Sequence, residues 1–239
     1  MKTKMIFIAI MALLTVTLFT SCEKIKGKGE VITETRSSGT FTKIGLDMSA
    51  TIYFTQDATY SLRVSGQENV LREVVTQVEG NQLVVKLKKG VILGSHDPVT
   101  VYISAPDLVG LDVSGSGDIY SDSPWNLDEL STTISGSGSI NIAMLTARHI
   151  SSSISGSGSI TVSSGTITNE DLNISGSGTI DLRGIGAESA YTRTSGSGTT
   201  YVKVTSQLDA TISGSGNVWY YGTPAINTHI SGSGSVKHL

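Results

Sequence analysis

Ile134-Ser135-Gly136-Ser137-Gly138-Ser139-Ile140 is one copy of the motif that decides the fold of this 239-residue chain. Its core, Ser-Gly-Ser-Gly, occurs seven times between residues 114 and 234, at intervals of 18 to 21 residues. A fixed period of this length is typical of one supersecondary unit stacked on the next. The seven copies begin at Ser114, Ser135, Ser155, Ser175, Ser195, Ser213 and Ser231.

Apolar residues recur at two fixed offsets from each copy, one residue before it and five residues after its first serine. Most are β-branched, which favours strands, and residues two apart in a strand share a face. Each period therefore reads as a strand, a tight corner, a second strand and a looser corner. We predict an all-β fold, a right-handed parallel β-helix (β-solenoid) with 18- to 21-residue coils, its handedness taken from the rule for parallel crossovers. The columns are Val113, Ile134, Ile154, Ile174, Thr194, Ile212 and Ile230, and Ile119, Ile140, Ile160, Ile180, Thr200, Val218 and Val236.

The Ser-Gly-Ser-Gly corner suits such a stack. A bend repeated about every 4.8 Å leaves little room for Cβ atoms, and glycine adopts positive φ without steric cost. We expect the serine hydroxyls to bond nearby backbone and the serine of the next coil. A flexible Gly/Ser linker is the alternative, but linkers do not alternate with isoleucines at fixed offsets.

The N-terminal half carries a degenerate form of the same pattern. Residues 46–53 resemble residues 111–120 with a corner two residues shorter, so we expect the stack to begin there. Strands are predicted over 60–64, 83–87 and 99–103, and one helical turn followed by a strand over 69–78. Residues 37–239 then form a single domain.

The chain begins with features of a secretory signal. Lys2 and Lys4 precede the apolar run 5–19, which is too short to span a bilayer comfortably. The only cysteine, Cys22, follows Leu18-Phe19-Thr20-Ser21, which resembles a bacterial lipobox. We predict a signal peptide over 1–21, lipidation of Cys22 and a polar tether over 22–36; an unmodified cysteine beside an ordinary cleavage site is the alternative.

Charge and localisation follow from that cleavage. Removal of residues 1–21 leaves 15 basic and 20 acidic residues, a net charge of about −5. No basic footprint for nucleic acid is present, so no such partner is expected. We expect an outer-membrane lipoprotein of the cell envelope, surface-exposed or facing the periplasm, with glycans or surface proteins as partners and an oligomeric state that the sequence leaves open.

Known chemical motifs are missing from the repeats. The calcium-binding nonapeptide repeat needs an aspartate at every turn, whereas only Asp118 is acidic at this place. Phosphate-binding loops, dinucleotide fingerprints and Gly-x-Ser-x-Gly elbows do not occur. We therefore expect no catalytic residue, cofactor or metal. The histidines fall at unrelated offsets: His96, His149, His229 and His238.

An enzyme remains the first alternative, because some parallel β-helices cleave polysaccharides. Charged residues flank the first corner or follow later ones, but two facing acids are not evident. The second alternative is a purely structural envelope protein. The residues weighed for catalysis are Asp112, Asp118, Asp181, Arg183 and Lys203.

A binding role has a clearer candidate. The sixth position after each first serine should face outward, which makes Tyr201 and Trp219 neighbours about 5 Å apart. Tyr221 lies two residues further along the strand of Trp219. We predict that these rings form a ligand-binding patch; the alternative is that they cap an open end of the solenoid.

The signal with Cys22, the strand-rich first hundred residues and the reiterated Ile-Ser-Gly-Ser-Gly-x-Ile together resemble the head GIN domain family of putative autotransporter adhesins, found in Bacteroidetes-type lipoproteins. The resemblance covers about residues 37–222, and further copies of the motif follow. It implies a β-helical envelope domain and, by analogy, an adhesin-like binding or interaction module without catalysis.

Overall fold

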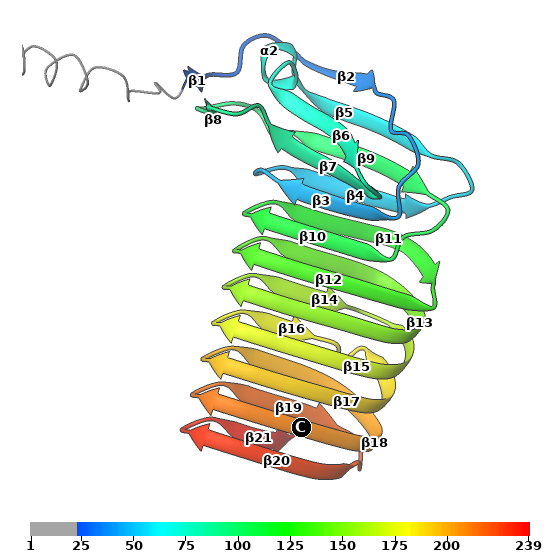
Figure 1. Ribbon diagram of the computed structural model, residues 1–239, viewed down its shortest axis with the longest axis vertical. Helices are drawn as coiled ribbons and strands as arrows, with labels where there is room; N and C mark the ends of the chain where they lie inside the picture. The colour runs from blue at the N-terminus through cyan, green and yellow to red at the C-terminus, as the bar shows by residue number, and fades with distance from the viewer. Residues whose placement is uncertain (1–22) are drawn as a thin grey trace, which may run out of the picture.

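The computed structural model describes residues 23–239 as a stack of parallel β-coils (Figure 1). The predicted all-β solenoid is confirmed. The signal peptide and the lipidation predicted at Cys22 lie outside the described residues. Within residues 23–239, no helix is long and apolar enough to cross a membrane.

Two parallel faces run the length of the stack. Face A is made by the strands that lead into each corner, and face B by the strands that leave it. From the N-terminal end, face A contains β7 (Gln82–Leu87), β3 (Lys43–Asp47), β10 (Gly110–Gly115), β12 (Glu129–Gly136), the later parts of β13 (Ser139–Gly156), β15 (Gly165–Gly176), β17 (Ile185–Gly196) and β18 (Thr199–Gly214), and β20 (Ala225–Gly232). Face B contains β9 (Thr100–Ala105), β4 (Thr51–Gln56), β11 (Asp118–Asn126), the beginning of β13, β14 (Ser159–Val162), β16 (Thr179–Asp181), the beginning of β18, β19 (Asn217–Tyr221) and β21 (Ser235–His238).

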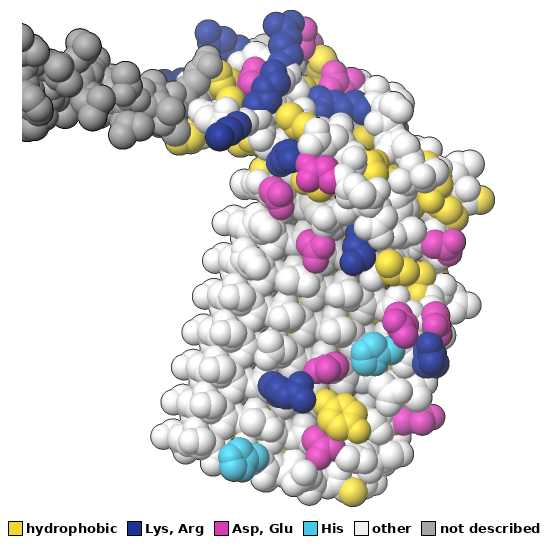
Figure 2. All heavy atoms as spheres, viewed as in Figure 1, with side chains coloured by type: hydrophobic (Ala, Val, Ile, Leu, Met, Phe, Trp, Pro, Cys, Tyr) yellow, Lys and Arg dark blue, Asp and Glu magenta, His cyan; other side chains and the backbone are white. Residues whose placement is uncertain are grey.

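The motif columns form the core, as predicted. Equivalent residues of successive coils pair in register, for example Ile134 with Ile154 on face A and Ile140 with Ile160 on face B. All four of these side chains are fully buried. Figure 2 looks onto face A, where white backbone and uncharged polar side chains cover the corner side of the coils. The isoleucine ladders therefore hold the coils together from inside.

The stacking requires both glycines in every corner except the first, where Gly115 has nothing within 4 Å of a Cβ and only its positive φ favours glycine. The first glycine has φ between +110° and +138° in all seven corners. A Cβ on Gly156 would lie 2.4 Å from the carbonyl oxygen of Gly136 in the preceding coil. A Cβ on the second glycine, Gly158, would lie 2.7 Å from Cγ2 of Ile134. No side chain fits at either position.

The hydrogen bonds between corners come from the backbone, which corrects the prediction of a hydroxyl ladder. The N–H of Ser157 donates to the carbonyl of Gly136 at 2.9 Å, and the later corners repeat this bond. Within residues 23–239, no hydroxyl–hydroxyl bond links the serines of successive tetrads. The positive φ of the first glycine turns its carbonyl towards the next coil, so the backbone makes the contact and Ser155 stays exposed.

The N-terminal half begins the stack, as predicted, because β3 pairs with β10 and β4 pairs with β11. The predicted alignment is confirmed after the corner, where Ile52 and Tyr53 pair with Ile119 and Tyr120, and was wrong by two residues before it. Leu46 lies opposite Val113 and Thr51 opposite Asp118, so this corner has the same length as the tetrad corners. The Leu-Asp dipeptides at 46–47 and 111–112 resemble each other but occupy different places in their coils.

Further N-terminal strands extend the two faces and confirm the strands predicted there. β5 (Ser61–Gln67) pairs antiparallel with β9 and with β2 (Val31–Thr35), and β6 (Val74–Glu79) pairs antiparallel with β7 after the short helix α2 (Glu68–Leu71). β1 (Glu23–Ile25) pairs with β8 (Val91–Leu93). Strands β1 and β2 both lie within the segment 22–36, for which a polar tether is predicted.

Candidate functional site

One outward column of face B carries most of the aromatic side chains outside the core. Strand alternation points this position away from the core in every coil. From the N-terminal end the column reads Tyr102, Tyr53, Tyr120, Asn141, Thr161, Asp181, Tyr201, Trp219 and Lys237, each paired in register with the next. The structure thus confirms that the sixth position faces outward.

The C-terminal part of this column and the residues two positions further along the chain form a cluster of rings and cations, which we call the C-terminal patch. Its members are Arg183, Tyr201, Lys203, Trp219, Tyr221 and Lys237. Tyr201 and Trp219 are register partners. The guanidinium of Arg183 lies 4.1 Å from the ring centroid of Tyr201, and the ammonium of Lys237 lies 5.2 Å from that of Trp219. These distances are within the range of cation–π attraction.

Asp181 fixes the position of Arg183 in the patch. The Nη2 and Nε groups of Arg183 donate to the Asp181 carboxylate at 2.6 and 2.9 Å. The hydrogen bond to Asp181 raises the pKa of Arg183 above its ordinary value. The carboxylate partner of Arg183 thus lies two residues earlier in the chain.

The predicted rings Tyr201, Trp219 and Tyr221 lie half-buried on the flank of the coils. The end of the core stays open, with Ile226 and Ile230 in β20 44% and 41% exposed. Tyr220 packs against the core, with its ring edge-on to His238 at 5.1 Å between centroids. Side chains alternate along β19, so Tyr220, two residues after the inward Val218, also points inward. The sequence could have identified it in this way.

The N-terminal end of the same column holds a second aromatic group that the sequence analysis missed. Tyr53 stacks on Tyr102 and on Tyr120, with 5.7 Å between ring centroids in both pairs. The guanidinium of Arg63 lies 5.3 Å from the centroid of Tyr102. The available signal was a tyrosine directly after Ile52, Val101 and Ile119. The resemblance of residues 46–53 to 111–120 aligned Tyr53 with Tyr120, but no motif marked the register of Tyr102.

The acidic residues named above as catalytic candidates do not form a facing pair. Asp112 accepts a hydrogen bond from Gln82 on face A, whereas Asp118 accepts one from Ser139 on face B. The corner separates the two carboxylates. Within residues 23–239, no group of three histidine, cysteine or acidic residues is arranged to hold a metal ion.

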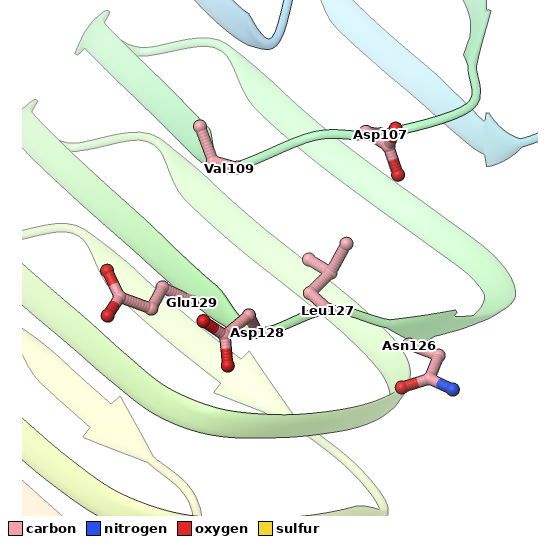
Figure 3. A pocket seen from close by; sticks show the side chains of 6 residues that line it. All are labelled: Asp107, Val109, Asn126, Leu127, Asp128 and Glu129. Carbon is pink, nitrogen blue, oxygen red and sulfur yellow. The ribbon is translucent and has the colours of Figure 1, made fainter.

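A groove beside the loops that precede β10 and β12 also carries acids (Figure 3). Its lining includes Asp107, Leu127, Asp128 and Glu129. Leu127 projects between Asp107 and Asp128, and Glu129 points away from Asp107. Arg148 donates to both oxygens of Asp128, at 2.7 and 2.6 Å, and these bonds lower the pKa of that carboxyl. Asp128 is therefore held ionised, which does not suit a general acid.

One carboxyl lies inside the core, away from both surfaces. Glu170 in β15 is fully buried, and neither of its oxygens has a hydrogen-bond partner. Desolvation raises the pKa of Glu170 well above its ordinary value. Its neighbours in adjacent coils are Ile150 and Ala190, so this carboxyl belongs to the packing of the solenoid.

Comparison with known proteins gives matches over most of the chain. Residues 40–224 match the family described as "Putative auto-transporter adhesin, head GIN domain". No curated protein matches the chain.

Several solved structures share the fold, among them two putative adhesins and a putative lipid binding protein. A putative adhesin from Bacteroides fragilis NCTC 9343 has a TM-score of 0.85 at 24% identity, over 90% of this chain and 100% of that one. A putative lipid binding protein from Parabacteroides distasonis ATCC 8503 has a TM-score of 0.76 at 27% identity, over 91% and 100%. A putative adhesin from Parabacteroides merdae ATCC 43184 has a TM-score of 0.72 at 23% identity, over 91% and 99%.

Proposed function

Since the chain belongs to the head GIN domain family of putative auto-transporter adhesins, we propose that it is an adhesin-like binding module of the cell envelope, anchored by a lipid on Cys22 and without catalytic activity. The observation that carries the proposal is the C-terminal patch. Its rings lie on neighbouring coils, remain partly exposed, and are held by cations on the surface of a rigid sheet. Side chains ordered before binding lose little entropy when a ligand arrives.

The names of similar structures are compatible with a binding role. Two are described as putative adhesins and one as a putative lipid binding protein. Aromatic side chains and arginine are enriched where proteins bind partners, because they combine large contact areas with hydrogen bonding. The patch offers this combination on the surface of face B.

The proposed anchor and the patch lie at opposite ends of the stack. Figure 1 shows β1 at one end of the coils and β19 and β21 near the other. Seven strand spacings separate β9 from β19 on face B, or about 34 Å at the usual spacing of about 4.8 Å. A lipid on Cys22 would therefore hold the patch away from the membrane, in a position to meet polymers or proteins.

The lipid anchor has its own test. Radiolabelled palmitate should enter the full-length protein in a bacterial host, and Cys22→Ala should abolish both labelling and membrane partitioning. A Cys22→Ala protein that still partitions with membranes would refute the anchor while leaving the binding role intact.

The binding role is tested with purified residues 23–239 on an array of glycans and host-matrix proteins. We expect retention on at least one class of surface, without release of cleaved product. Product release would favour the polysaccharide lyase or hydrolase, and an absence of retention on every surface would favour a purely structural envelope protein.

Trp219→Ala locates the binding surface, with Tyr191→Ala as the matched control. Tyr191 is 42% exposed on face A, the opposite side of the solenoid. We expect Trp219→Ala to lose retention with a melting temperature close to that of the unmodified protein, and Tyr191→Ala to keep both. A large fall in melting temperature with unchanged retention would show that Trp219 supports the coil and does not bind.

A further inference from the structure

The C-terminal patch is positively charged on a chain that is acidic overall. Along the outward side of face B from β16 to β21, three cationic side chains accompany a single acidic side chain, whereas the whole chain has a net charge of −3. The cations are Arg183, Lys203 and Lys237, and the acidic side chain is Asp181. This local excess of cationic side chains attracts anions to this end of the molecule.

Two of these cations remain available to a ligand. Arg183 is paired with Asp181 at 2.6 Å. Within residues 23–239, Lys203 and Lys237 take part in no salt bridge, and both side chains are exposed. Trp219 orients the ammonium of Lys237 at 5.2 Å from its ring centroid.

The spacing of the two lysines suits an extended ligand. Lys203 pairs with Tyr221, and Lys237 pairs with Trp219. They are therefore two coils and two residues apart, which places their backbones about 12 Å from each other. The coil between them carries Tyr221 and Trp219, whose hydroxyl and indole N–H are hydrogen-bonding groups. A flat sheet surface does not enclose a small molecule as a pocket does, so useful affinity requires a chain that contacts several of these groups at once.

We infer that the C-terminal patch binds an acidic polysaccharide, a linear glycan whose carboxylate or sulfate groups meet Lys203 and Lys237 while its hydroxyls bond the intervening side chains. The inference rests on the proposed binding role and adds the class of ligand. The negative charge of the ligand follows from the unpaired lysines. Its sugar backbone follows from the aromatic and hydroxyl groups between them, which a simple counterion would not need.

The test compares dextran sulfate with dextran, which share a backbone and differ in charge, and adds polyglutamate as an anion without sugar rings. Binding of purified residues 23–239 is measured by biolayer interferometry. We expect binding to dextran sulfate, at least tenfold weaker binding to dextran and polyglutamate, and loss of binding at 1 M salt, where the screening length is about 3 Å. The variant Lys203→Gln/Lys237→Gln should weaken binding to dextran sulfate about tenfold. The matched control Lys24→Gln/Lys28→Gln makes the same change in net charge near β1 and should leave it unchanged.

The outcomes separate the two claims. Equal binding to dextran and dextran sulfate, equal binding to polyglutamate, or an equal loss in both double variants would overturn the acidic glycan. In those cases a retained neutral glycan or protein partner on the array would still support the binding module. Failure to bind any surface would overturn both the acidic glycan and the binding module.

Discussion

Replacing Glu170 by leucine is expected to stabilise the solenoid by an amount that grows with pH. The side chain of Glu170 is fully buried, both of its oxygens lack partners, and it occupies a column that is otherwise apolar. The neighbours of Glu170 in this column are Leu130, Ile150, Ala190 and Leu208. Leucine therefore fits the pattern of the site, and the unpaired carboxyl does not.

The sign of the pH dependence follows from burial. Desolvation raises the pKa of Glu170 in the folded protein well above 4.5, whereas the unfolded chain ionises near that value. The folded state is thus favoured most below pH 4.5, and stability falls as the pH rises towards the folded pKa. Each pH unit in this window removes about 1.4 kcal/mol.

The magnitude has two parts. At pH 4 the carboxyl is neutral in both states, and Glu170→Leu should gain about 1–3 kcal/mol by removing unpaired polar atoms. Above pH 4.5 the gain should increase by about 1.4 kcal/mol per unit until the folded pKa is reached. For a domain of this size, 1 kcal/mol corresponds to about 2–4 °C in melting temperature.

The assay is calorimetric melting of residues 23–239 between pH 4 and 8. Glu188→Leu provides the control, because Glu188 is exposed in the next coil and its replacement should leave the pH profile unchanged. The reasoning is refuted if Glu170→Leu melts below the unmodified protein throughout, or if its melting temperature depends on pH as strongly as that of the unmodified protein.

Two further predictions concern the stability of the coils. Gly156→Ala should lower the free energy of unfolding by about 3 kcal/mol or more, because the residue has φ of +130° and its Cβ would lie 2.4 Å from a backbone oxygen. The control is Gly186→Ala, whose Cβ would meet nothing within 4 Å. In the same urea titration it should change the free energy of unfolding by less than about 0.5 kcal/mol. Arg36→Ala should lower the free energy of unfolding by about 1–3 kcal/mol, because the carbonyls of Leu71 and Val74 lose a donor. An unchanged denaturant midpoint would mean that Arg36 does not hold β2.

The repeated coils could be predicted because each inward position occurs several times. An exceptional residue in one coil therefore does not obscure the apolar pattern of the others. Ile140 and Ile160 mark their column without any structural information, and they pair as expected. The glycine corners follow from the same argument, since a stack forbids Cβ atoms there.

The remaining features depend on contacts that a repeat does not encode. Tyr102 belongs to a coil without a tetrad and without a sequence match to a later coil, so its register with Tyr53 appears only once the strands are paired. Glu170 interrupts an apolar column that the sequence analysis did not track. The contact between Arg183 and Tyr201 depends on how one long side chain folds over the next coil.

Thiol accessibility tests most directly whether the tetrads are bends in one coil lined by isoleucine. Residues 23–239 contain no cysteine, so Ile154→Cys and Ser155→Cys each place a single thiol on adjacent residues. Ile154 is fully buried and Ser155 is exposed. Under native conditions, Ser155→Cys should react with a maleimide as fast as a peptide thiol, and Ile154→Cys should be protected until the protein unfolds. Equal, rapid labelling of both would contradict the continuous coil.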